Sequence, residues 1–131
     1  MFIDASALVA MLASEEDAPE LFRRLENTTT RLTSPLAIWE ASVALARNQA
    51  RSVKAVEQEV YEFLSLMKIE MIPIPASSAG LALDAFERYG KGHHKAGLNF
   101  GDCFAYACAS LLGVPLLYKG ADFALTDIES A

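Results

Sequence analysis

The chain has 131 residues, of which 53% are hydrophobic and 21% are charged, and its formal net charge at pH 7 is −6. This length is enough for one sizeable hydrophobic core, and we expect a single domain over residues 1–131. The acidic balance excludes a generally basic nucleic-acid-binding protein, but not an enzyme that acts on nucleic acid with the help of cations at its site.

Short apolar runs alternate with helical patterns along the chain. We expect strands at residues 2–4, 31–33, 70–74 and 116–118. We expect helices at residues 5–14, 19–25, from 35 onward, 53–67, 78–89 and 101–112. Ser34 and Pro35 are a typical helix start, with an N-cap followed by proline at the first helical position. Pro73 places its strand at a sheet edge, because proline has no backbone N–H to donate.

This alternation predicts an α/β fold with a central parallel sheet covered by helices on both faces. In such sheets, ligands bind beyond the carboxyl ends of the strands. Asp4 ends the first expected strand and Asp122 follows the last one, while Asp102 begins the helix before that last strand and Glu40 lies in the second turn of its helix. The topology therefore allows these four acids to meet.

Each acid also has an ordinary structural explanation. Asp4 can cap the helix that follows it, and Asp102 can stabilise the first turn of its own helix, with Asn99 as the cap. Glu40 alone fits a solvated helix position, and Asp122 alone fits a turn. If the four acids do gather, their charges require a cation. Oxygen ligands suit Mg²⁺ or Mn²⁺, and such ions usually serve phosphoryl chemistry.

The sequence favours a cytoplasmic protein without a membrane segment. The chain opens Met1-Phe2-Ile3-Asp4, with no basic segment ahead of an apolar run. The longest uncharged run, residues 103–118, is shorter than the ~20 residues that span a bilayer. Cys103 and Cys108 lie five residues apart in a helical pattern, which favours free buried thiols over a disulfide.

Basic residues cluster in one stretch between residues 88 and 95. An ordinary solvated loop explains this cluster, and the adjacent His93 and His94 make a poor transition-metal site because they point to different sides. The alternative is a set of phosphate contacts that position an RNA backbone without reading its sequence. The candidates for these contacts are Arg88, Lys91, His93, Lys95 and Lys119.

Several segments together resemble one protein family. They are Ile3-Asp4-Ala5-Ser6-Ala7-Leu8, Trp39-Glu40-Ala41-Ser42, the run 98–107 (LNFGDCFAYA), the run 116–123 (LLYKGADF) and Thr126-Asp127-Ile128. Across the whole chain this pattern is similar to the PIN-domain nucleases, and within them to the VapC-type toxins of prokaryotic toxin–antitoxin modules. The resemblance implies a three-layer α/β/α PIN-like fold and a Mg²⁺- or Mn²⁺-dependent endoribonuclease.

The resemblance also assigns roles to residues. It makes Asp4, Glu40, Asp102 and Asp122 the catalytic acids, with Asp4, Asp102 and Asp122 as metal ligands and Glu40 completing the coordination or orienting a water. Ser6 and Asn99 match supporting polar positions. The family often has Asp or Asn where this chain has Ala121, and Asp127 either compensates as an outer acid or caps the terminal segment.

The resemblance further implies an RNA substrate cut to a 5′-phosphate and a 3′-hydroxyl, a homodimer, and inhibition by a small cognate antitoxin protein. A catalytically silent PIN-fold module that acts through protein contacts is the alternative, which the change at Ala121 keeps open. A phospho-acceptor receiver domain shares the size and the α/β alternation. It needs paired acids after the first strand, where this chain has Asp4 followed by Ala5.

Overall fold

Four short parallel strands form the centre of the fold in the computed structural model, which describes residues 1–131. They are β1 (Phe2–Ile3), β2 (Leu32–Thr33), β3 (Glu70–Met71) and β4 (Leu116–Leu117). Their order across the sheet is β3-β2-β1-β4, and every neighbouring pair is parallel. β3 lies at an edge, as Pro73 predicts.

Helices occupy all the expected regions. They are α1 (Ala5–Leu12), α2 (Ala18–Glu26), α3 (Pro35–Asn48), α4 (Val53–Leu66), α5 (Ser78–Tyr89), α6 (Phe100–Leu112) and the short 3₁₀ helix η1 (Phe123–Leu125). The first helix stops at Leu12 instead of continuing to Ser14, because Ser14 has a φ of 52°, outside the helical region. None of the helices is long and apolar enough to cross a membrane.

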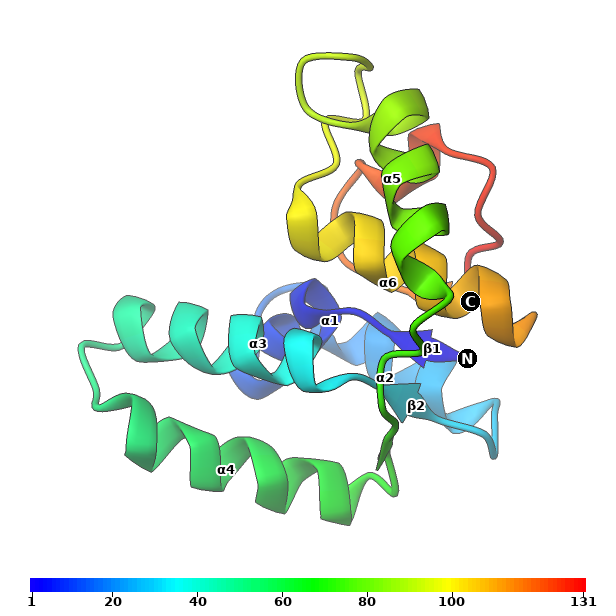
Figure 1. The fold of residues 1–131 in the computed structure, drawn as a ribbon. Coiled ribbons are helices and arrows are strands. Elements are labelled where there is room, and N and C mark those ends of the chain that lie inside the picture. The colour runs from blue at the N-terminus through cyan, green and yellow to red at the C-terminus, as the bar shows by residue number, and fades with distance from the viewer.

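The sheet separates two hydrophobic cores because neighbouring strand residues point to opposite faces. Ile3 and Leu117 belong to a core formed with α1, α2, α3 and α4, whereas Phe2 and Leu116 belong to a second core formed with α5 and α6. Figure 1 shows this division, with α3 and α4 as an antiparallel pair on one side and α5 and α6 on the other. The three-layer α/β/α arrangement expected from the sequence is confirmed.

Local hydrogen bonds fix the starts of the helices that carry the candidate acids. The Ser34 hydroxyl accepts a hydrogen bond of 3.2 Å from the Ala37 amide at the start of α3. At the start of α6, Asn99 and Asp102 form a reciprocal capping box, with hydrogen bonds of 2.8 and 3.0 Å. α6 ends at Gly113 in the left-handed conformation, and its two cysteines are free and buried.

Candidate active site

Asp4 occupies the point where β1 becomes α1, and only 3% of its surface is exposed. Both the backbone amide and the hydroxyl of Ser6 donate to the Asp4 Oδ2 atom, at 2.9 and 2.5 Å. The Ser6 hydroxyl also accepts a hydrogen bond of 3.0 Å from the Lys119 amide, just beyond β4. The expected N-cap is therefore confirmed, and Ser6 joins the carboxyl ends of two neighbouring strands around this carboxylate.

Glu40 and Asp102 reach the same region from opposite layers of the fold. Glu40 lies on α3 and Asp102 in the first turn of α6. The Glu40 carboxylate rests directly against Gly101, so closely that a Cβ at residue 101 would overlap it. Because glycine has no side chain, Gly101 makes the space in which this carboxylate lies.

The charges of these acids affect one another. Burial raises the pKa of Asp4. Burial raises the pKa of Glu40 to about 7, with the negative charges of Asp4 and Asp102 adding to the effect. Burial also raises the pKa of Asp102 to about 6, opposed by the hydrogen bond from the Asn99 amide and reinforced by the charges of Asp4 and Asp122. All four expected acids therefore lie within electrostatic reach of at least one other member.

The donor chemistry of this cluster fits a hard divalent cation. It offers carboxylate oxygens, with neither a thiolate nor an imidazole among them, and oxygen ligands are those preferred by Mg²⁺ and Mn²⁺. The acids do not form a closed cage, because no three His, Cys, Asp or Glu side chains are close enough to hold one ion in their present rotamers. Asp122 in particular is exposed, at the start of η1, and its carboxylate caps no backbone amide.

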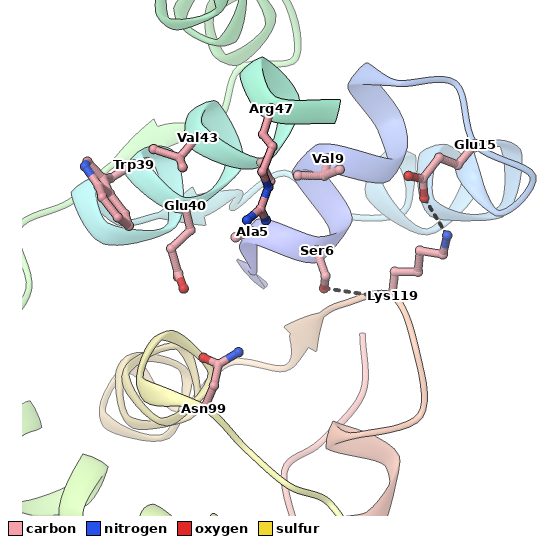
Figure 2. A pocket seen from close by; sticks show the side chains of 11 residues that line it. Ala5, Ser6, Val9, Glu15, Trp39, Glu40, Val43, Arg47, Asn99 and Lys119 are labelled. Atoms are coloured by element: carbon pink, nitrogen blue, oxygen red, sulfur yellow. Dashed lines mark hydrogen bonds and ion pairs between the residues drawn. The ribbon is translucent and has the colours of Figure 1, made fainter. Parts of the chain in front are cut away.

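A cleft of about 490 Å³ opens beside Glu40, between α1, α3 and the segments that begin α6 and follow β4. Figure 2 shows Glu40, Ser6, Asn99 and Lys119 around its inner part. The Lys119 ammonium pairs with Glu15 at 2.5 Å and with Asp17 at 3.5 Å, so its charge is partly neutralised within the chain. The other residues that line the cleft are Ala5, Val9, Trp39, Val43, Ala44 and Arg47.

Asp127 is bonded to residues outside the four acids. Its carboxylate accepts hydrogen bonds of 2.6 Å from the Tyr106 hydroxyl and 2.6 Å from the Arg88 guanidinium. Its partners are thus on α5 and α6 and include none of the four acids, and these bonds fasten the C-terminal segment to those two helices. A role for Asp127 as an outer acid of the cluster stays a prediction. The same ion pair engages Arg88, one of the candidates for contact with an RNA backbone.

The loop after α5 does not line the cleft. Lys119 lines the cleft, whereas Lys91, His93 and Lys95 do not. The His93 ring packs edge-on against the Phe86 ring, with 5.1 Å between the ring centroids. The Nδ1 atom of His94 accepts a hydrogen bond of 3.1 Å from the Ala96 amide. Both histidines therefore have structural neighbours. Contact of this loop with an RNA backbone stays a prediction.

Trp39 and Arg47 also line the cleft, although the sequence alone assigned a role to neither side chain. Trp39 and Arg47 lie eight residues apart on α3, with Val43 midway between them. Residues spaced by four share a helix face, so this spacing was the available signal. The spacing of these three residues is hard to recognise in the sequence, because the same helix also has an apolar face that includes Ile38, Ala41 and Leu45.

Comparison with known proteins connects this site to one family. The sequence profile of the PIN domain matches residues 1–129. The chain is 41% identical over 130 residues to the VapC ribonuclease Mb0640 of Mycobacterium bovis, covering 99% of this chain and 97% of that protein. It is 39% identical to a ribonuclease VapC of Mycolicibacterium smegmatis over 130 residues, covering 99% of this chain and 98% of that protein.

Solved structures agree on the fold. The crystal structure of VapC20 of Mycobacterium tuberculosis, described as a sarcin-ricin loop cleaving toxin, matches with a TM-score of 0.75 at 16% identity, covering 99% of this chain and 97% of that one. A toxin–antitoxin complex from Klebsiella pneumoniae matches with a TM-score of 0.69 at 20% identity, covering 96% and 92%. At these identities the likeness concerns the fold.

Proposed function

The chain belongs to the PIN-domain family, and we propose that it is a metal-dependent endoribonuclease, the toxin of a toxin–antitoxin pair. The observation that carries this proposal is the meeting of Asp4, Glu40 and Asp102, from β1, α3 and α6, beside an open cleft. The relatives named as VapC ribonucleases support RNA as the substrate.

In the proposed site, Asp4, Asp102 and Asp122 would hold Mg²⁺ or Mn²⁺. Ser6 orients the Asp4 carboxylate, and Asn99 orients the Asp102 carboxylate through the capping box. When bound, the cation would supply Lewis-acid polarisation of the scissile phosphate and activation of the attacking water.

The chain itself supplies a proton acceptor. Glu40, with a pKa of about 7, is ionised in a large fraction of molecules near neutral pH and can take a proton from the water that attacks phosphorus. Its carboxylate lies against Gly101 at the start of α6, near Asp102. Glu40 therefore combines a position near Asp102 with a pKa near neutral pH, and a general base needs both a suitable position and a suitable pKa.

The proposed protein partners are a cognate antitoxin and a second copy of the chain. The similarity to a chain of a toxin–antitoxin complex supports the first. An entirely apolar groove of about 390 Å³ between α5 and α6 supports a protein-binding surface. Three of its lining residues are exposed large hydrophobic side chains, namely Leu83, Phe86 and Phe100.

Cleavage of total RNA by the purified protein, free of antitoxin, tests the proposal. We expect cleavage with Mg²⁺ or Mn²⁺, no cleavage with EDTA, and loss of cleavage in Asp4→Asn and Asp102→Asn. Cleavage that persists in EDTA would refute the metal dependence. If RNA stays intact with either cation, the silent protein-binding module is the better description.

A further inference from the structure

Trp39 is a large aromatic side chain that lies at the mouth of the cleft and stays 63% exposed. It directly precedes Glu40 on α3, and both side chains line the same cleft (Figure 2). A single exposed aromatic residue needs no explanation on a protein surface. Its position beside Glu40, in the lining of the same cleft, is what distinguishes Trp39.

Arg47 lies two turns further along α3 and lines the same cleft. Eight residues of helix separate it from Trp39 by about 12 Å along the axis. The Arg47 guanidinium makes neither a hydrogen bond nor an ion pair within the chain, in contrast to Lys119 across the cleft. Figure 2 shows its side chain extending from α3 toward α1, over the cleft. An unpaired guanidinium suits a phosphate group.

We propose that this cleft binds an unpaired nucleotide of RNA next to the cleaved bond, with the base stacked on Trp39 and a neighbouring phosphate held by Arg47. The proposal rests on the proposed ribonuclease function and adds two residues that would hold the nucleotide beside the cleaved bond. A base must be unpaired to present its face to an aromatic ring.

The lining of the cleft favours RNA over a protein partner. Apolar Val9 and Val43 lie beside charged Glu40 and Arg47 in the same cleft. The groove between α5 and α6, in contrast, has an exclusively hydrophobic lining. A ligand with both a flat apolar base and a charged backbone matches the first surface, whereas an apolar protein segment matches the second.

Fluorescence can test the stacking directly, because Trp39 is the only tryptophan of the chain. The Asp102→Asn variant prevents cleavage, and the probes are a short single-stranded RNA of mixed sequence and the same ribose–phosphate strand without bases. We expect saturable quenching of the emission by the RNA and little quenching by the strand without bases. Equal quenching by both strands, or by neither, would overturn the proposal.

Kinetics on the RNA that the wild type cleaves give the second readout. Loss of a base stack in Trp39→Ala should raise KM by about 5-fold to about 150-fold with little change in kcat, and Trp39→Phe should recover most of the loss. Arg47→Ala should also raise KM. Tyr61→Ala, which removes another exposed aromatic ring on α4, is the matched control and should have no effect.

The outcomes separate the two proposals. If the wild type cleaves RNA and Trp39→Ala keeps the wild-type KM, only the nucleotide subsite is overturned, and Trp39 belongs to some other surface. If the wild type neither cleaves RNA nor binds the single-stranded probe, the ribonuclease function falls and the subsite falls with it. A raised KM together with base-dependent quenching supports both.

Discussion

Replacing Glu40 with glutamine removes one charge from the acidic cluster and should stabilise the metal-free protein at alkaline pH. Folding raises the pKa of Glu40 from 4.5 to about 7, so the folded protein binds more protons than the unfolded chain between these values. The contribution of Glu40 to stability is therefore greatest below pH 4.5 and is lost as the pH rises through about 7. Glutamine carries no charge, so the Glu40→Gln variant should not show this decline.

The size of the effect follows from the shift. A rise of about 2.5 units corresponds to roughly 3 kcal/mol. Because Glu40 is partly exposed, solvent screening lowers this to about 1–2 kcal/mol. For a chain of this length, such a gain in the free energy of unfolding raises Tm by roughly 3–10 °C.

Thermal unfolding in EDTA at pH 8 and at pH 5 measures this difference. The gain in Tm of Glu40→Gln over the wild type should be clear at pH 8 and small at pH 5, where folded Glu40 is mostly protonated. Glu16→Gln removes an exposed glutamate outside the cluster and serves as the control. If Glu40→Gln is no more stable than the wild type at pH 8, the acids are not coupled as described and the argument for a cation loses its basis.

Three further predictions concern the cation, the cavity for Glu40 and the C-terminal segment. Mn²⁺ at 10–100 times its Kd should stabilise the wild type at pH 8 by about 1.4–2.7 kcal/mol in a thermal-shift assay, and Asp4→Asn should abolish this gain. Gly101→Ala should displace the Glu40 carboxylate and sharply lower RNA cleavage, whereas Gly80→Ala, where a Cβ meets nothing within 4 Å, should keep activity and gain about 0.5–1 kcal/mol of stability. A folded, fully active Gly101→Ala would refute that role. Asp127→Asn should lower the free energy of unfolding, measured by urea denaturation near neutral pH, by at most about 1 kcal/mol, because its ion pair is exposed. The same measurement at low pH should show the difference shrinking as the wild-type carboxylate protonates, since its hydrogen bonds from Tyr106 and Arg88 lower its pKa to about 2.

Features of the site that depend on neighbouring residues in the chain could be predicted from the sequence. Asp4 before a helix, Ser34 before proline, and Asn99 three residues before Asp102 are local capping patterns, and the structure has all three caps. The strand and helix order follows from the same kind of local reading. These patterns work because each cap is completed within two or three residues.

Features that join distant segments could not be read in this way. Asp127 meets Arg88 across 39 residues and Tyr106 across 21, and no local pattern indicates either bond. The contact of Glu40 with Gly101 depends on how closely α3 approaches α6. The resemblance to a family supplied the four candidate acids, whereas packing between the layers decides which side chains lie beside them.

The two-residue strands determine where the chain can tolerate an insertion or a deletion. In β1, Phe2 belongs to one core and Ile3 to the other. Inserting or deleting a single residue there would place each side chain on the wrong face of the sheet. No strand has spare residues to absorb such a shift. Insertions and deletions should therefore be tolerated only in exposed connections such as residues 49–52 between α3 and α4 and 91–95 after α5. These connections are where a label or a fused domain could be inserted without disturbing the four acids.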